Sequence, residues 1–188
     1  ECYSEIYFDE AEPPLGALQA AVKLGRRFER VVVFSSLSKR SNVPGMRSGF
    51  VAGDAAILKD FLLYRTYHGG AMNPAVQDAS VAAWNDETHV LENRKKYTDK
   101  FARITPLMQT ALRVERPDAG FYLWAPTPIA DTEFARRLYA EQNVTVLPGS
   151  YIARESRGSN PGANYVRLAL VAETDECLEA TRRLVEFT

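Results

Sequence analysis

The chain has 188 residues, 46% of them hydrophobic and 25% charged, which suits one compact domain or two small ones with a hydrophobic core. Its 23 basic and 24 acidic residues nearly cancel, so we expect a small-molecule partner, and neither nucleic acid nor a membrane surface. Two cysteines and two histidines offer no disulfide framework or metal-ligand spacing, and no apolar run approaches the roughly 20 residues that cross a bilayer, so we expect a cytoplasmic protein without a metal site.

The first part of the chain alternates predicted strands and helices, separated by glycine and proline. Strands are predicted over residues 31–34 and 48–54, a strand or the exit from one over residues 1–8, and helices over residues 17–24 and 55–64. The sequence opens without methionine on residues 1–8, so we interpret it as a piece of a longer protein whose sheet begins upstream. This order of elements predicts an α/β fold.

A long, charge-rich helical region follows. It covers residues 75–84 and about 90–112 and is interrupted only at Pro106. Because a helix of this length tends to bridge two lobes, we predict a domain boundary within it. Residues 1–90 are then part of a larger domain, and residues 91–188 form a small one.

The last part of the chain predicts a smaller α+β unit. Strands are predicted over residues 120–124, 144–147 and 165–170, and helices over residues 131–142 and 174–187. Asp131 or Thr132 is the predicted cap of the first helix and Thr174 that of the second, because side-chain oxygens accept hydrogen bonds from the first N–H groups. The polar, glycine-rich residues 154–162 predict a surface loop.

A lysine stands just after the strand predicted at residues 31–34. Hydroxyl-rich residues 35–38 separate the strand from Lys39, and Arg47 comes eight positions later. Strands of an open α/β sheet bind ligands at their carboxyl ends, and a lysine amine in a partly desolvated pocket is a nucleophile toward carbonyl groups. Since a guanidinium fork and hydroxyl donors suit a phosphate dianion, the pattern predicts a pyridoxal phosphate site around Lys39.

Residues 36–50, Ser-Leu-Ser-Lys-Arg-Ser-Asn-Val-Pro-Gly-Met-Arg-Ser-Gly-Phe, resemble the active-lysine motif of fold-type I, class I/II aminotransferases. The resemblance implies that Lys39 bonds covalently to pyridoxal phosphate and is the catalytic base, while Ser36 and Arg47 contact the cofactor phosphate. It also implies that residues 1–90 are the carboxyl-terminal part of an aspartate aminotransferase-like large-domain sheet. Residues 91–188 would be the small α+β domain of such an enzyme.

Two more segments resemble motifs of this family. The opening Glu-Cys-Tyr is similar to a strand end, Asp-Glu-x-Tyr, and implies that Tyr3 donates to the cofactor ring oxygen. The aspartate that pairs with the pyridine nitrogen would precede residue 1, so we expect weak or absent cofactor retention and activity from these residues alone. Residues 164–170 resemble the strand whose arginine binds the substrate α-carboxylate, a role that falls on Arg167.

A finer resemblance is to bacterial N-succinyldiaminopimelate aminotransferases, on residues 64–74 and the Pro-Gly-Met-Arg of residues 44–47. It implies transfer of an amino group from glutamate to N-succinyl-2-amino-6-oxopimelate in lysine and diaminopimelate biosynthesis, by a homodimer. The acceptor, the residues supplied by a missing amino-terminal part and the oligomeric state of these residues alone stay open.

Three other functions stay open. A pyridoxal-dependent β-lyase shares the same lysine and arginines, and a non-catalytic aminotransferase-like module would keep the fold without turnover. Residues 36–39 also fit the Ser-x-x-Lys pattern of penicillin-binding proteins and β-lactamases, in which the serine is an acyl nucleophile. That pattern is short, its Ser-Asp-Asn and Lys-Thr-Gly companions are absent, and we expect Lys39 to follow a strand where such a hydrolase has a helix.

Overall fold

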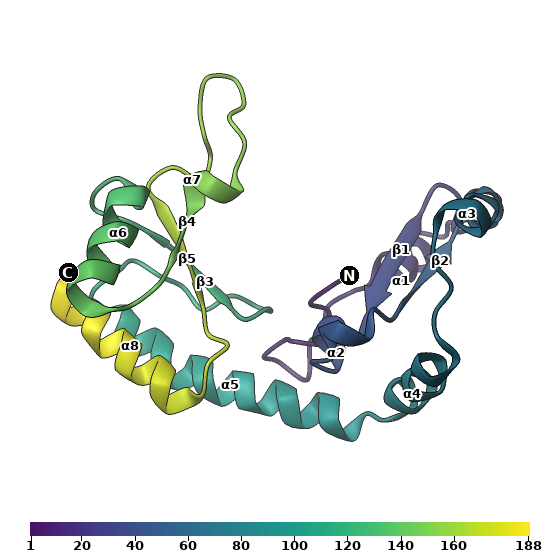
Figure 1. Ribbon diagram of the computed structural model, residues 1–188, viewed down its shortest axis with the longest axis horizontal. Helices are drawn as coiled ribbons and strands as arrows, with labels where there is room; N and C mark the ends of the chain where they lie inside the picture. The colour runs from purple at the N-terminus through teal and green to yellow at the C-terminus, as the bar shows by residue number, and fades with distance from the viewer. The chain divides into compact units, whose positions relative to one another are not determined.

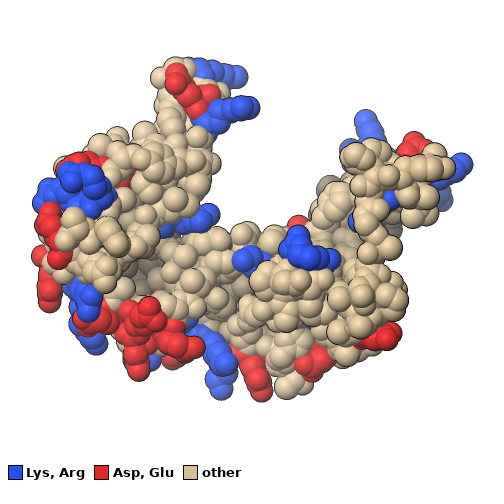
Figure 2. All heavy atoms as spheres, viewed as in Figure 1, with Lys and Arg blue, Asp and Glu red and all other residues tan.

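The computed structural model describes residues 1–188, which form two compact units, Glu1–Lys95 and Lys96–Thr188. Figure 1 labels the elements of both units, and helix α5 (Thr88–Met108) contains residues of each. The assignment of residues 1–90 and 91–188 to the large and small domains of an aminotransferase stays a prediction. Basic and acidic side chains are interspersed on the face shown in Figure 2, in keeping with a net charge of −1.

The first unit is built around a two-stranded antiparallel ribbon of β1 (Val32–Ser36) and β2 (Gly49–Gly53). Its other elements are α1 (Ala17–Lys23), α2 (Leu37–Arg40), η1 (Pro44–Met46), α3 (Ala55–His68) and α4 (Pro74–Asn85). The ribbon pairs Val32 with Gly53 and Ser36 with Gly49. A side chain at Gly49 would collide with the carbonyl oxygen of Ser35 on the neighbouring strand, so only glycine allows this close pairing.

Side-chain caps begin helices α2, α3 and α4 of this unit. The Asp54 carboxylate accepts from the N–H groups of Ala56 and Ile57 at the start of α3, at 2.8 and 3.3 Å. The Asn73 side chain accepts from Ala75 N–H at 2.9 Å, directly before α4. Such caps satisfy N–H groups that have no partner within the helix.

The second unit is a three-stranded antiparallel sheet in the order β3-β5-β4, packed with helices. Its elements are β3 (Tyr122–Pro126), α6 (Asp131–Gln142), β4 (Leu147–Pro148), α7 (Gly149–Ile152), β5 (Tyr165–Ala169) and α8 (Thr174–Phe187). The core consists of apolar side chains that are at most 1% exposed: Phe101, Ile104, Leu123, Ala125, Phe134, Leu138, Val166 and Leu184. Burial of each large apolar side chain contributes roughly 1.5–3 kcal/mol, so this core dominates the stability of the unit.

The predicted bounds of α6 and α8 are confirmed, but their predicted caps are wrong. The N-cap positions are Ala130 and Glu173, and neither helix has a side-chain cap bond. Asp131 is 5% exposed, and its carboxylate accepts from backbone N–H groups outside α6. The hydrogen bonds of Asp131 to distant backbone groups therefore replace the predicted cap on α6.

Residues 1–8, predicted as a strand or the exit from one, contain no strand, because they form bends and turns with a single bridge residue at Tyr7. The N–H of Ile6 donates to the carbonyl oxygen of Tyr3 at 3.0 Å, which closes a turn and buries the Ile6 side chain to 1% exposure. The aromatic and β-branched residues of this segment thus pack within a turn.

A third difference concerns Lys39, which lies on the short helix α2 and not on an extended chain after a strand. The argument that a Ser-x-x-Lys hydrolase would need a helix at this point therefore no longer separates the two functions. No helix of the structure is both long and apolar enough to cross a membrane. No three His, Cys, Asp or Glu side chains are grouped so that they could hold a metal ion.

Candidate functional site

The turn that carries Lys39 is fixed at its base by hydrogen bonds. Ser36 is the N-cap of α2, and its hydroxyl oxygen accepts from Ser38 N–H at 3.1 Å. The same hydroxyl donates to the carbonyl oxygen of Ser48 at 2.9 Å and lies 2.8 Å from the hydroxyl of Ser38. Leu37 follows with no exposed surface. Lys39 therefore occupies a half-buried position two residues after a fully buried anchor.

Arg47 lies at the other end of the same loop. Its backbone is left-handed, with φ 53° and ψ 38°, and its guanidinium donates to the Pro44 carbonyl oxygen at 3.0 Å. A left-handed backbone is uncommon outside glycine, so this conformation is imposed by the surrounding turn. The side chain is exposed, and it lines a hollow of about 840 Å³ whose other lining residues include Arg65.

Ser36 is the last residue of β1, and Lys39 and Arg47 lie in the loop that connects β1 to β2. The N–H of Leu37 donates to the Ser48 carbonyl oxygen at 3.2 Å, directly beside the paired residues Ser36 and Gly49. The loop between them is thereby closed at its base. Ser36 and Lys39 do not line the hollow that Arg47 lines, and their roles toward a cofactor stay predictions.

Tyr3 belongs to the same unit. The amino group of Glu1 donates to the carbonyl oxygen of Phe34 at 2.9 Å, which places the first residues beside β1. The Tyr3 side chain is 37% exposed, enough to reach a bound molecule. Its predicted role toward the cofactor ring stays a prediction.

Arg167 lies on β5 of the second unit, paired with Trp124 on β3. The carbon atom of its guanidinium lies 4.4 Å from the centre of the Tyr122 ring, so the planar cation stacks on an aromatic face. Its Nε atom is buried and has no hydrogen-bond partner. A buried unpaired donor costs about 1–3 kcal/mol, and more when it is charged, so an acceptor from outside the unit would relieve this cost. A carboxylate matches the guanidinium edge.

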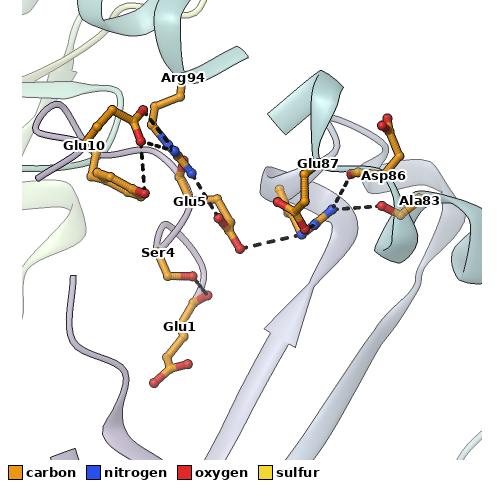
Figure 3. A network of polar contacts seen from close by, with 10 residues as sticks. Glu1, Ser4, Glu5, Glu10, Ala83, Asp86, Glu87 and Arg94 are labelled. Carbon is orange, nitrogen blue, oxygen red and sulfur yellow. Dashed lines mark hydrogen bonds and ion pairs between the residues drawn. The ribbon is translucent and has the colours of Figure 1, made fainter. Parts of the chain in front are cut away.

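Two buried arginines of the first unit were not predicted from the sequence. The side chains of Arg40 and Arg94 are 4% and 5% exposed, and both pair with Glu5. The Arg94 guanidinium also donates to the Glu10 carboxylate at 2.7 Å and stacks on Tyr7 at 3.8 Å. Figure 3 shows Arg94 between the carboxylates of Glu5 and Glu10. Arginine is usually exposed, so only the position of Arg40 next to Lys39 could have drawn attention to it.

Three polar side chains beside α2, those of Ser41, His89 and Asp86, are connected by hydrogen bonds. His89 Nε2 is 2.8 Å from the Ser41 hydroxyl, and His89 Nδ1 is 2.5 Å from the Asp86 carboxylate. The hydrogen bond with His89 lowers the pKa of Asp86 to about 2. These residues are separated by 45 or more positions from Ser41, so no local sequence signal brings them together.

The family model for aminotransferase class I and II matches residues 1–184. The chain belongs to the class I and II aminotransferases. Members of this family use pyridoxal phosphate, and the chain spans about half the length of the relatives it matches. The activity, substrates and partners of the whole protein are therefore proposals.

Individual aminotransferases match over nearly the whole chain. An aminotransferase structure from Neisseria meningitidis Z2491 is 55% identical with a TM-score of 0.95, over 100% of this chain and 48% of that one. The LL-diaminopimelate aminotransferase of Maridesulfovibrio salexigens is 30% identical, over 97% of this chain and 45% of that protein. A probable N-succinyldiaminopimelate aminotransferase structure from Thermus thermophilus is 28% identical with a TM-score of 0.81, over 99% of this chain and 48% of that one. The aspartate aminotransferase-like α/β fold is thus confirmed.

Proposed function

We propose that the chain supplies the reactive lysine, the phosphate contacts and the carboxylate-binding arginine of a pyridoxal phosphate-dependent aminotransferase. The single observation that supports this best is the buried Nε of Arg167, a cationic donor without an acceptor in a chain of this family. The donor set of the first unit also fits the cofactor. It offers an amine at Lys39, a guanidinium at Arg47 and a hydroxyl at Ser36 within one closed loop.

Each of these residues has a task in the proposed reaction. Arg47 and Ser36 hold the cofactor phosphate, and Tyr3 donates to the ring oxygen. When bound, pyridoxal phosphate supplies an electron sink that stabilises negative charge at the substrate α carbon. Arg167 binds the substrate carboxylate and fixes its orientation. The Lys39 amine would hold the cofactor covalently and, as the general base, would accept the proton from the substrate α carbon.

For the substrates we propose glutamate as amino donor and N-succinyl-2-amino-6-oxopimelate as acceptor, in lysine and diaminopimelate biosynthesis. The motif at residues 64–74 and the likeness to the Thermus thermophilus structure support this choice. A free diaminopimelate substrate is the nearest competitor, given the relative from Maridesulfovibrio salexigens. The proposed whole enzyme is a cytoplasmic homodimer.

Covalent trapping tests the central step. Pyridoxal phosphate and borohydride are added to the longer protein that contains these residues, and peptide mass spectrometry locates the reduced adduct. We expect it at Lys39, and we expect Lys39→Ala to remove it. In the protein that contains these residues, Lys39→Ala should lower kcat at least about 10²-fold, the low end of what a general base contributes. Adducts spread evenly over the lysines would refute the assignment.

Turnover assays separate the remaining functions. Glutamate is paired with N-succinyl-2-amino-6-oxopimelate in one arm, and LL-diaminopimelate is offered as amino donor with 2-oxoglutarate in another. A β-lyase would instead release ammonia and pyruvate from a suitable amino acid. In the longer protein that contains these residues, trapping at Lys39 without turnover in any arm would indicate a non-catalytic module, and acylation of Ser36 by a β-lactam would indicate the hydrolase.

A further inference from the structure

The three residues that follow Lys39 are all bonded to one segment of the first unit, residues 83–93. This segment joins the end of α4 to the start of α5. We call Arg40, Ser41 and Asn42, together with residues 83–93, the clamp. Its residues lie outside the set that contacts the cofactor in the proposed function.

Arg40 makes the largest contribution to the clamp. Its guanidinium donates to the Ala83 carbonyl oxygen at 2.9 Å and pairs with the carboxylate of Glu87. The Asp86 carbonyl oxygen accepts from it at 3.5 Å, and the Glu5 carboxylate forms an ion pair with its Nε at 3.6 Å. The cation also lies 5.0 Å from the centre of the Trp84 ring. A buried cation surrounded by acceptors in this way holds its backbone in one place, because any displacement leaves a charge unpaired.

Ser41 and Asn42 extend the contact along the same segment. The Ser41 hydroxyl bonds to His89, which in turn bonds to Asp86. The Asn42 side chain donates to the side-chain oxygen of Asn93 at 3.0 Å. Three successive residues are thus tied to successive parts of the segment.

Helix α2 needs such external support. It has four residues, and its closing backbone bond runs from Ser41 N–H to the Leu37 carbonyl oxygen at 3.0 Å. Isolated helices of this length are unstable in water, so tertiary contacts must set its orientation. The bond from Leu37 N–H to the Ser48 carbonyl oxygen fixes its start, and the clamp fixes its end. Lys39 lies between these two points.

We propose that Arg40 is a positioning residue for Lys39, acting through residues 83–93 and assisted by Ser41 and Asn42. The inference rests on the proposed function, since the position of the Lys39 amine matters for the covalent chemistry assigned to it. Arg40 does not touch the reacting atoms in this scheme. It keeps the amine on an ordered turn.

The chain offers a matched control for Arg40. Arg94 is equally buried, shares Glu5 as a partner and stacks on an aromatic ring in the same manner. It does not adjoin Lys39 in the sequence. Arg40→Met and Arg94→Met therefore remove the same kind of group, and a merely structural role would give both variants the same effect on Lys39.

The readout is the acetylation of Lys39 in the cofactor-free chain. Trace acetic anhydride is applied, and mass spectrometry gives the ratio of modified Lys39 to modified Lys59, an exposed residue of α3. We expect Arg40→Met to raise the ratio at least about threefold, within the coupling range for residues in contact. Arg40→Lys should give an intermediate rise, and Arg94→Met little change. Equal ratios in Arg40→Met and Arg94→Met would overturn the proposal.

A second variant and a second measurement test the proposal even if Arg40→Met does not fold. If Arg40→Met fails to fold by circular dichroism, Ser41→Ala replaces it, because it breaks the bond to His89 without leaving a buried charge unpaired. Borohydride trapping with pyridoxal phosphate then asks whether the adduct at Lys39 falls in the clamp variants but not in Arg94→Met. If the longer protein that contains these residues is not trapped at Lys39, the proposed function fails, whereas the acetylation ratios still decide whether Arg40 positions the lysine.

Discussion

Replacement of Asp131 by asparagine should destabilise the second unit in a way that depends on pH. The Asp131 carboxylate accepts from Ser150 N–H at 2.8 Å and from Asn164 N–H at 3.4 Å. It thereby ties the start of α6 to α7 and to the residue before β5, the strand that carries Arg167. Asparagine keeps the shape but loses the charge and directs an amide N–H₂ at one of the donors.

The expected loss is about 1.5–3 kcal/mol, the contribution of hydrogen bonds to a charged group. Burial opposes ionisation of Asp131, but the hydrogen bonds from Ser150 and Asn164 outweigh it and lower the pKa of Asp131 below its ordinary value of 3.8. A carboxylate with a lowered folded-state pKa stabilises the fold above its unfolded pKa, and this stabilisation is lost as pH falls through the folded pKa. The difference between the parent chain and Asp131→Asn should therefore be complete near pH 7 and shrink below 3.8.

Urea unfolding followed by the fluorescence of Trp124 measures this difference. The chain has two tryptophans, so a Trp84→Phe background makes Trp124, which stacks on Tyr165 in the sheet, the sole reporter. Asp118→Asn, at an exposed position of the same unit, serves as the control and should change the unfolding free energy by less than about 0.5 kcal/mol. If Asp131→Asn has the same stability as its parent at pH 7, or if the difference persists undiminished at pH 2, the reasoning is refuted.

Two further predictions concern the first unit. The hydrogen bond with His89 lowers the pKa of Asp86 to about 2. The Asp86 carboxylate should therefore stabilise the fold above pH 3.8, and this stabilisation should be lost as the pH falls toward 2. In urea titrations, His89→Asn should reduce the dependence of the unfolding free energy on pH in this acid range. Gly49→Ala should destabilise by about 1–3 kcal/mol in the same assay, because its Cβ would collide with Ser35, whereas Gly45→Ala has open space and should change stability by less than about 1 kcal/mol.

Helices that end at local signals could be predicted from the sequence. The helix predicted at residues 17–24 corresponds to α1, and Gly25 follows it with φ 66°, a left-handed conformation that glycine adopts without strain. The bounds of α6 and α8 were likewise predicted from helical periodicity. Their caps were not, because the Asp131 carboxylate bonds to residues 19 and 33 positions away.

The turn at residues 1–8 shows why the sequence pattern alone does not decide between a strand and the exit from one. The carbonyl oxygen of Glu5 accepts from Arg94, which lies 89 residues further along the chain. Glu10 binds the same guanidinium across 84 residues. A pattern of β-branched and aromatic residues predicts that a segment is partly buried, but distant partners decide whether it extends or turns.

Some residues of the candidate site could likewise be predicted from neighbouring sequence, whereas others depend on contacts between residues far apart in the chain. Ser36, Lys39 and Arg47 could be proposed from the sequence because one closed loop contains all three. The clamp around Arg40 could not, because its acceptors belong to residues that come 43 to 47 positions later.

Arg40 and Arg94, which are buried, differ in one respect from Arg167, which is half-buried with a buried Nε atom. Arg40 and Arg94 each meet carboxylates and carbonyl oxygens from their own unit, so their burial is balanced internally. Arg167 lies on a strand with its Nε buried and without an acceptor. Since an unpaired cationic donor lowers stability, a structural role would have been served better by an apolar residue. We infer that the partner of Arg167 Nε comes from outside the second unit, and a substrate carboxylate is the partner we propose, because it matches the charge and the planar edge of the guanidinium.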